Sequence, residues 1–312
     1  MTRILFVGQD KGGVGKSTLV RGVAEAIPEV PILEIDSAHR LIEFDRGRGA
    51  GRPRQVTHFE MRATRAEIEK SGGKAARREF DAVVRAVEGA EAPTVVDIGA
   101  NTCGSLFELL AEIAPDLKEA GIALGVLTVV TAEAPAITEA LKMSESARAW
   151  ADVRFVVENR LKGAVPPDKL AKIAGGAPIS VFEEIAMEAE AVEFLEARGL
   201  RDIPHVDRAQ LNSRYGISQG TRIRRDLTNF RVSAMEALLN RQSLEELRHA
   251  LHQLKGAGGG YGFSTISDHA GQAEKLIREQ AEFDTVRRQV QELIELVRSV
   301  DGYDQRKESA AT

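Results

Sequence analysis

The sequence has a single cysteine and no long apolar run. Cys103 alone, among 312 residues, excludes an internal disulfide framework and a cysteine-cluster metal site. The longest apolar runs, such as residues 123–130, are far shorter than the roughly 20 residues that a membrane helix needs. The first apolar stretch has the length of a strand and leads into polar residues, unlike a signal peptide. We therefore expect a cytoplasmic protein with no membrane span.

A large excess of charge of one sign is also missing. The formal net charge is −5, which argues against a protein whose whole surface binds nucleic acid but leaves room for local basic patches. The hydrophobic content of 43% excludes a disordered chain. A length of 312 residues is too great for one small core, so we expect at least two domains.

The first two thirds of the chain alternate short, β-branched runs with longer helical patterns. Strands are predicted at residues 4–8, 32–36, 94–98, 123–130 and 155–158, with a weaker one at 179–182. Helices are predicted at residues 17–26, 75–88, 105–119, 135–150 and 183–197. Continuous apolar strands separated by helices indicate an α/β fold, with a parallel sheet covered by helices on both faces.

Strand patterns and prolines are both missing from residues 221–300. Apolar residues recur there at steps of three and four, which predicts helices at residues 221–239, 243–257, 264–280 and 283–299. Four helices with short links predict an all-α, antiparallel four-helix bundle. The predicted domains are therefore residues 1–220 and 221–304, followed by a disordered polar tail at 305–312.

A glycine-rich segment lies between the first predicted strand and the first predicted helix. Backbone N–H groups in such a loop, together with the positive helix end, can bind phosphates. Lys16 would neutralise the β- and γ-phosphates, and the hydroxyl of Ser17 would bind Mg²⁺. Asp10 stands where the strict P-loop motif has glycine, and a plain strand-to-helix turn is the alternative. The predicted phosphate-binding residues are Gly12, Gly13, Val14, Gly15, Lys16, Ser17 and Thr18.

The run from Lys11 to Thr18, with a lysine before two glycines, resembles the deviant P-loop of the ParA/MinD family of partitioning and positioning ATPases. The resemblance covers about residues 1–220. It implies ATP and Mg²⁺ as cofactors and a homodimer that sandwiches ATP. It also implies that Lys11 reaches the nucleotide of the partner subunit, where a cation would stabilise charge on the transferred phosphoryl group.

Three predicted strands end in polar residues that the resemblance gives a role. Asp36 stands where the family has its first switch aspartate, which implies that it orients the attacking water or the Mg²⁺ shell. Residues 37–40 lack the proline-glutamine pair common in ParA proteins. Asp97 ends a Walker B-like strand and is expected to hold Mg²⁺ through water, and Asn159 lies where relatives contact the base. Either aspartate alone could instead be a solvated strand end.

Two segments are locally basic. Arg222, Arg224 and Arg225 lie near the predicted domain junction, where ParA-like proteins bind nonspecific DNA through basic residues. The resemblance thus implies DNA binding and nucleoid association, and a solvated helix face is the alternative. Residues 40–74 are rich in arginine and glycine, which fits either a nucleic-acid surface or a mobile switch loop.

A histidine in the predicted bundle lies beside the buried stripe of its helix. That stripe consists of Leu244, Leu247, Leu251 and Leu254. His252 is about 100° around the helix from Leu251, and Lys255 and Gly256 share its face. Glycine within a helix costs about 1 kcal/mol relative to alanine, which suggests that Gly256 keeps this face open.

The spacing His-x-x-Lys-Gly, with leucine before the lysine, resembles the core motif of the histidine-phosphotransfer (Hpt) domain over about residues 222–302. The resemblance implies that His252 accepts a phosphoryl group, that Lys255 supplies a charge for it, and that a response-regulator receiver domain is the partner. His249 is not at the motif position. A surface histidine without function is the alternative.

Together these features favour a dimerising, ATP-dependent ATPase of the ParA/MinD type, for partitioning or subcellular positioning, with an Hpt module that accepts and passes a phosphoryl group. A nucleotide-binding docking or scaffold protein without turnover or phosphotransfer is the alternative, and a P-loop ligase is a third hypothesis. The sequence does not identify the cargo, the partitioning adaptor or the partner receiver.

Overall fold

The computed structural model describes residues 2–27, 30–44, 55–61, 74–237, 241–279, 281 and 283–300. The chain is divided into two compact units between Leu238 and Leu239. The predicted tail at 305–312 and the arginines of residues 45–54 lie outside the described residues. Within the described part, none of the helices has the length and apolar character that crossing a membrane requires.

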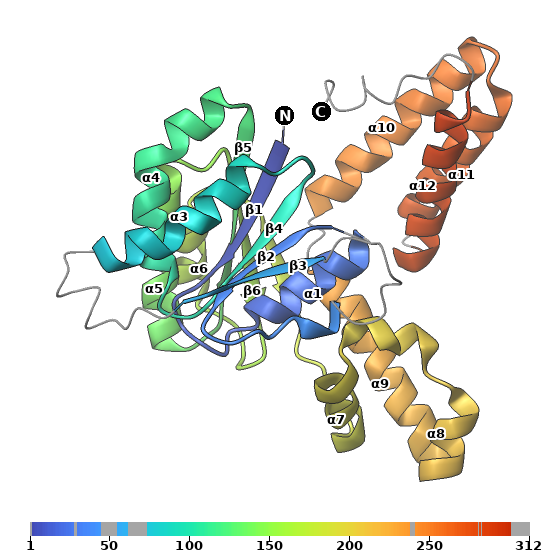
Figure 1. Ribbon diagram of the computed structural model, residues 1–312. Coiled ribbons are helices and arrows are strands. Elements are labelled where there is room, and N and C mark those ends of the chain that lie inside the picture. Colours follow the sequence, from blue (N-terminus) through green and yellow to red (C-terminus); the bar gives the residue numbers. More distant parts are fainter. Residues whose placement is uncertain are drawn as a thin grey trace. The chain divides into compact units, whose positions relative to one another are not determined.

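The first unit contains a seven-stranded parallel sheet in the order β3-β2-β4-β1-β5-β6-β7 (Figure 1). The strands are β1 (Thr2–Gly8), β2 (Ile32–Asp36), β3 (Val56–Glu60), β4 (Thr94–Ile98), β5 (Ile122–Val130), β6 (Val153–Asn159) and β7 (Ile179–Phe182). All five residues of β4 are buried, as a strand covered on both faces requires. The predicted α/β class is confirmed.

Helices cover both faces of this sheet, and neighbouring residues of β1 point to opposite sides. Val7 packs in a cluster with α1 (Lys16–Ala26), α7 (Ala189–Arg198) and α9 (Ile217–Glu236). Phe6 packs in another with α3 (Lys74–Glu88), α4 (Cys103–Glu119) and α5 (Ala134–Arg148). The rings of Phe6 and Phe107 meet the Trp150 indole edge-on, with centroids 5.9 and 5.1 Å away.

Several elements of the first unit differ from the prediction. The strand β3 was not predicted, because only Val56 and Phe59 among its five residues are large apolar side chains and it lies at the edge of the sheet. Two short helices, α6 (Pro167–Ala174) and α8 (Arg208–Tyr215), were also missed. The helix expected at residues 183–197 begins only at Ala189, and the residues before it line a cavity described below.

The helix predicted at residues 221–239 as part of the bundle is α9, and it packs in the first unit. Ile223, Leu227 and Ala234 are buried with residues of α1 in the same hydrophobic cluster. Arg231 also forms an ion pair of 2.5 Å with Glu25 of α1. The division of the structure therefore differs from the boundary predicted at residue 220. An apolar stripe indicates that a helix face is buried, but not which neighbour covers it.

The second unit is helical, and its described residues form three helices rather than the four predicted: α10 (Arg241–Gly260), α11 (Ser264–Arg278) and α12 (Phe283–Arg298). α11 packs against both of the others. One cluster of buried residues joins the three helices: Leu251, Ile266, Ala270, Ala273 and Leu293. The turn between α10 and α11 contains Gly262 with a φ of 83°, a conformation that favours glycine.

Candidate nucleotide and phosphotransfer sites

The predicted P-loop connects the carboxyl end of β1 to the start of α1. In the sheet, β1 lies between β4 and β5. Helix α1 begins at Lys16, directly after Gly15, which has a φ of 95° and no side chain to cap the helix. The first N–H groups of α1 can therefore bind an anion. Lys16 is buried, and its Nζ donates hydrogen bonds of 2.7 Å to the Gln9 carbonyl and 3.4 Å to the Lys11 carbonyl. A cation is thus held inside the loop.

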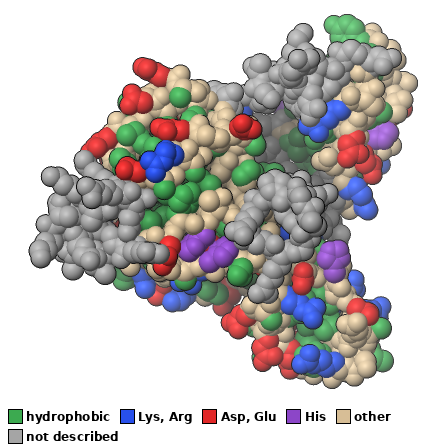
Figure 2. Space-filling model, viewed as in Figure 1, with side chains coloured by type: hydrophobic (Ala, Val, Ile, Leu, Met, Phe, Trp, Pro, Cys, Tyr) green, Lys and Arg blue, Asp and Glu red, His purple; other side chains and the backbone are tan. Residues whose placement is uncertain are grey.

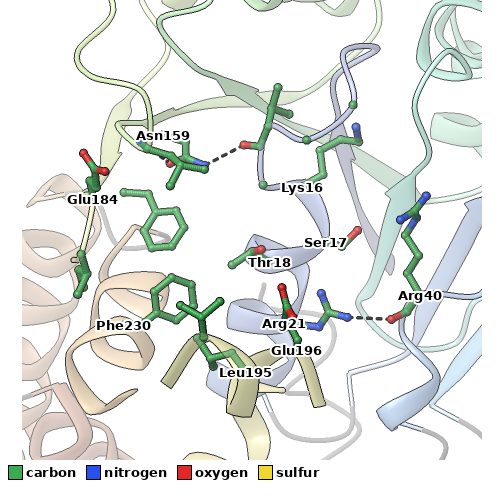
Figure 3. Close-up of a pocket in the computed structure, with 18 of the residues that line it drawn as sticks. Lys16, Ser17, Thr18, Arg21, Arg40, Asn159, Glu184, Leu195, Glu196 and Phe230 are labelled. Atoms are coloured by element: carbon green, nitrogen blue, oxygen red, sulfur yellow. Dashed lines mark hydrogen bonds between the residues drawn. The ribbon is translucent and has the colours of Figure 1, made fainter. Parts of the chain in front are cut away.

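Asn159, at the end of β6, forms a hydrogen bond with the P-loop. Its Nδ2 donates a 2.9 Å hydrogen bond to the carbonyl of Val14 (Figure 3). Its Oδ1 accepts one of 3.1 Å from the Leu161 amide. A Cβ on Gly15 would lie 2.6 Å from this Nδ2, so both the φ and the contact require glycine. The expected role of Asn159 in base binding stays a prediction, because both of its polar atoms contact the protein here.

Asp10 joins the P-loop to the start of α4. Its two carboxylate oxygens accept hydrogen bonds of 2.8 Å from the Cys103 amide and 3.2 Å from the Gly104 amide. Burial raises the pKa of Asp10, and these two hydrogen bonds oppose the rise. The departure from the strict motif therefore has a structural explanation, since a glycine at position 10 could not cap α4.

A cavity of about 790 Å³ opens beside the P-loop (Figure 3). Its polar end is formed by the loop, Asp36 and Arg40. Away from the loop the lining includes Glu183, Glu184 and Glu196 as well as apolar side chains, and the ring centroids of Phe182 and Phe230 lie 5.6 Å apart there. The apolar lining also includes Leu161, Ile185, Met187, Val192 and Leu195. A cavity of this size, with a phosphate loop at one end and aromatic rings at the other, suits a nucleotide.

Asp97, at the end of β4, carries a buried carboxylate beside the P-loop. Its Oδ1 has no hydrogen-bond partner among the described residues. Burial raises the pKa of Asp97 to about 6, against the opposing hydrogen bond from Ser17 and the charge of Lys16. Gly99 allows this strand end to approach β2, because a Cβ there would lie 2.8 Å from the Ile35 carbonyl. An unsatisfied buried carboxylate next to a hydroxyl fits an Mg²⁺ ion, which usually takes one or two carboxylates plus phosphates and water.

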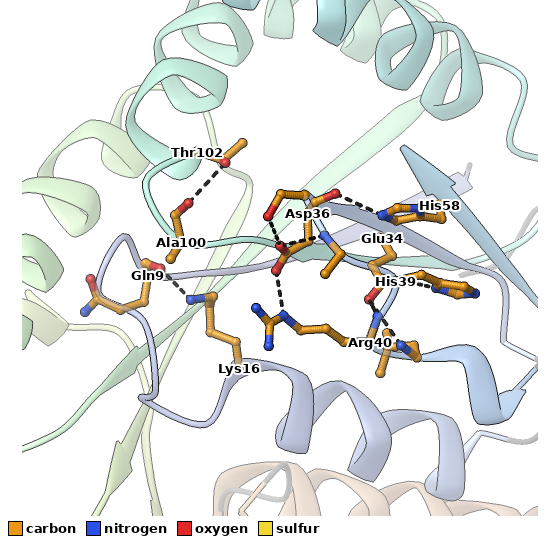
Figure 4. Close-up of polar contacts among 12 residues, drawn as sticks. Gln9, Lys16, Glu34, Asp36, His39, Arg40, His58, Ala100 and Thr102 are labelled. Atoms are coloured by element: carbon orange, nitrogen blue, oxygen red, sulfur yellow. Dashed lines mark hydrogen bonds and ion pairs between the residues drawn. The ribbon is translucent and has the colours of Figure 1, made fainter. Parts of the chain in front are cut away.

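The loop after β2 is held by a buried carboxylate that the sequence analysis left without a role. Glu34 Oε1 accepts hydrogen bonds of 2.6 Å from the Arg40 amide and 3.2 Å from the Leu41 amide, and its Oε2 pairs with His39. Figure 4 shows this cluster beside Asp36. The His39 ring stacks on that of His58 from β3, with centroids 5.1 Å apart. The network fixes the backbone that follows Asp36.

The arginines predicted to bind DNA are partly engaged with carboxylates. Arg222 pairs with Glu188 at 2.6 Å, and Arg225 pairs with Asp226 at 3.0 Å, whereas Arg224 is exposed. Figure 2 shows positive and negative side chains interspersed over the region of α8 and α9 that faces the viewer. DNA binding by these residues stays a prediction.

In the second unit, His252 and Lys255 converge on one carboxylate from the next helix. His252 is exposed on α10, and its Nδ1 lies 3.0 Å from Glu274 Oε1 of α11. Lys255 Nζ lies 3.6 Å from the other oxygen of Glu274. Partial burial acts to raise the pKa of Glu274, but the hydrogen bond from His252 and the charges of His252 and Lys255 outweigh it and hold the pKa below its usual range.

Small residues leave space around His252, Lys255 and Glu274. A Cβ on Gly256 would meet nothing within 4 Å, so there is open space at this position on the face that it shares with His252. A Cβ on Gly271 of α11 would lie 3.4 Å from the Lys255 side chain, which shows that the lysine crosses α11 at this point. The sequence analysis missed Glu274, because the pairing of α10 with α11 does not follow from either helix alone.

Comparison with known families supports part of the sequence analysis. Residues 226–302 match the family described as "Hpt domain", which confirms the resemblance inferred from His252, Lys255 and Gly256. The match includes the second half of α9, although that helix packs in the first unit. No curated protein matches the chain.

Solved structures similar to this chain include an ATP complex of McdA from Cyanothece and the MinD cell division protein from Aquifex aeolicus. The McdA complex is 12% identical, with a TM-score of 0.38, and the match covers 73% of this chain and 96% of McdA. MinD is 16% identical, with a TM-score of 0.36, and the match covers 73% of this chain and 98% of MinD.

Proposed function

We propose that the first unit binds ATP with Mg²⁺, dimerises around it and hydrolyses it, and that the second unit accepts and passes a phosphoryl group at His252. The observation that carries the first part is the combination of an uncapped helix start and a buried lysine beside a nucleotide-sized cavity, with a buried Asp97 oxygen nearby that has no hydrogen-bond partner among the described residues. Each of these groups is costly to bury or leave unsatisfied without a ligand.

Ser17, Asp36 and Asp97 are the residues that would hold Mg²⁺. The bound ion would neutralise charge on the terminal phosphates. The chain's own residues bind and orient the nucleotide: the α1 N–H groups and Lys16 take the phosphates, and Phe182 and Phe230 bound the other end of the cavity. Asp36 lines the same cavity as Lys16 and would orient the water that attacks the terminal phosphorus.

Dimerisation depends in this proposal on Lys11. Its side chain makes no hydrogen bond or ion pair with any residue in the described part of the chain, although its charge contributes to lowering the pKa of Glu133 after that of Lys162. A cation held so loosely is available to a second nucleotide.

The test combines sedimentation with phosphate release for the full chain and ATP·Mg²⁺. Lys11→Ala should bind ATP as the wild type does, but lose ATP-dependent dimerisation and reduce turnover by about 10-fold or more, since cations supplied this way contribute at least that much. Lys162→Ala is the control. It removes a lysine that pairs with Glu133 at 2.9 Å, and it should change neither ATP-dependent dimerisation nor turnover. Normal dimerisation by Lys11→Ala would refute its role. ATP binding with no phosphate release from the wild type would favour the scaffold alternative.

Phosphotransfer is supported by the orientation of His252. Glu274 is ionised and can only accept a hydrogen bond, so the proton of the neutral imidazole lies on Nδ1 and the lone pair on Nε2. Nε2 would attack the phosphorus of a receiver acyl phosphate. The P–N bond forms, the P–O bond to the receiver aspartate breaks, and that aspartate leaves as a carboxylate. Glu274 would balance the positive charge on the phosphorylated ring.

Incubation of the full chain with phosphorylated receiver domains, followed by mass analysis at neutral pH, tests this step. We expect one acid-labile phosphoryl group on wild-type protein, none on His252→Gln, and a normal amount on His249→Gln. Label retained by His252→Gln, or no label from any receiver, would leave the second unit as a docking module.

A further inference from the structure

Arg40 is a cation that lines the same cavity as the P-loop but has no role in the function proposed above. It lies in the loop after β2, and its side chain is 59% exposed. Its Nε donates a 3.0 Å hydrogen bond to Asp36 Oδ2, as Figure 4 shows. Its two terminal nitrogens make no hydrogen bond to any residue that the structure describes. A guanidinium has five N–H donors, so four remain for a ligand.

The backbone of Arg40 is held by two hydrogen bonds, whereas its side chain is held by one, at Nε. The amide donates to Glu34 Oε1 at 2.6 Å, and the carbonyl accepts a 2.8 Å hydrogen bond from Arg21 Nη2 (Figure 3). The next residue, Leu41, is fully buried. The guanidinium can therefore turn about its side-chain torsions while its point of attachment beside the cavity stays in place.

The contact of Arg40 with Asp36 is weaker than the contact that a guanidinium can make with a terminal phosphate. Asp36 offers a single carboxylate oxygen to Nε, and the geometry is not bidentate. A terminal phosphate carries more negative charge and presents several oxygens, which match the planar fork of a guanidinium. A diphosphate lacks that terminal group. Exchange of Arg40 from Asp36 to the phosphate would also free Asp36 Oδ2.

We propose that Arg40 binds the terminal phosphate of a nucleoside triphosphate in this cavity and so sets the preference for triphosphate over diphosphate. The inference rests on the proposed nucleotide site. Arg40 would then be a cation supplied by the same chain as the P-loop, in addition to Lys16. It would leave Asp36 only when a triphosphate is bound, so the contact between Arg40 and Asp36 would distinguish the two nucleotide states.

Equilibrium binding of ADP and of a non-hydrolysable ATP analogue, both with Mg²⁺, to the full chain tests the proposal. Arg40→Gln should bind the triphosphate analogue about 10-fold or more weakly, as expected for the loss of charge-assisted hydrogen bonds. Its affinity for ADP should stay within about twofold, because no charged partner of the shorter nucleotide is removed. Arg148→Gln, which removes an arginine paired with Glu145 on α5, should leave both affinities unchanged.

The other outcomes separate this inference from the proposed function. If the wild type binds neither nucleotide, the nucleotide site itself is wrong and Arg40 loses its role with it. If the wild type binds both and Arg40→Gln changes both affinities equally, or neither, only the inference about Arg40 is wrong. Should Arg40→Gln fail to fold, Arg40→Lys carries the test: it keeps the charge without the paired donors, so triphosphate affinity should still fall at least about threefold with ADP binding unchanged.

Discussion

Asp97 shows how a single residue near the P-loop links pH to stability. Burial raises the pKa of its carboxyl to about 6 from an ordinary value of 3.8. The folded protein therefore binds a proton that the unfolded chain releases, so this group adds stability as the pH falls through 6 and reduces stability above it. The shift corresponds to a cost of about 3 kcal/mol at most for the ionised group at neutral pH.

Asp97→Asn should therefore make the nucleotide-free protein more stable at pH 8, with a gain that shrinks as the pH falls below 6. Urea unfolding followed by the fluorescence of Trp150 measures this, because the chain has one tryptophan and it is buried in the first unit. Asp168→Asn, which removes an exposed carboxylate from α6, serves as the control and should have no such pH-dependent effect. An unchanged stability of Asp97→Asn at both pH values would contradict the assigned cost.

Glu274 acts on His252 through a hydrogen bond rather than through contact with the phosphoryl group. Glu274→Gln can no longer fix the proton on Nδ1 or balance the charge of the phosphorylated ring. We expect the rate of phosphorylation to fall by about 10-fold or more, since charge-assisted hydrogen bonds contribute at least this much. Glu279→Gln, a change at the end of the same helix, should leave the rate unchanged. Equal rates for wild type and Glu274→Gln would show that the contact has no functional role.

The residues that local spacing alone could predict, without a family resemblance, are those whose partners lie nearby in the chain. Lys16 and Ser17 follow the loop directly, and His252 and Lys255 share one helix face. Glu274 lies on another helix, and Glu34 acts on backbone amides six and seven residues later. Neither contact has a sequence signature, because both depend on how the chain folds back. Asp10 looked like a departure from a motif and is explained only by α4.

At the scale of elements, α9 is the main difference between prediction and structure. Its apolar stripe was predicted correctly as buried, but the partner is α1, the helix that follows the P-loop. Strand β3 was missed for a related reason: an edge strand needs fewer apolar residues, and its polar side chains contribute His58, whose Nε2 contacts the Asp36 carbonyl at 2.9 Å. Buried central strands were predicted because β-branched and other apolar residues make up most of their length.

The ion pair between Arg231 and Glu25 should hold α9 on α1. Both side chains are almost buried, with 11% and 13% exposed, so removal of one charge leaves the other poorly solvated. Arg231→Met should lower the free energy of unfolding of the first unit by about 3 kcal/mol. Urea unfolding monitored by Trp150 fluorescence measures this unit alone. His252→Gln, in the second unit, should not move the same transition, whereas an unchanged midpoint for Arg231→Met would show that α9 is held by its apolar contacts only.

For the whole molecule, we propose that the boundary between the domains lies near residue 238 rather than 220. A chain cut after residue 220 loses all but the first four residues of α9 and exposes apolar residues of α1 such as Val20 and Val23, whereas a chain cut after 238 keeps them covered. The shorter piece should aggregate or unfold, and the longer piece should show the Trp150 transition of the full chain. Equal stability of the two pieces would place α9 with the second unit, as the start of the Hpt match at residue 226 would suggest.

The central claim about the whole molecule is that its first unit binds ATP through the P-loop. Calorimetric titration of the full chain with ATP·Mg²⁺ tests this most directly, beside Lys16→Ala and a control, Lys142→Ala, which removes a surface lysine of α5. We predict one nucleotide per chain for wild type and control, and a loss of affinity of about 100-fold or more for Lys16→Ala, since the phosphates lose their buried cation. Equal affinity of Lys16→Ala and wild type, or no binding by the wild type, would contradict the claim.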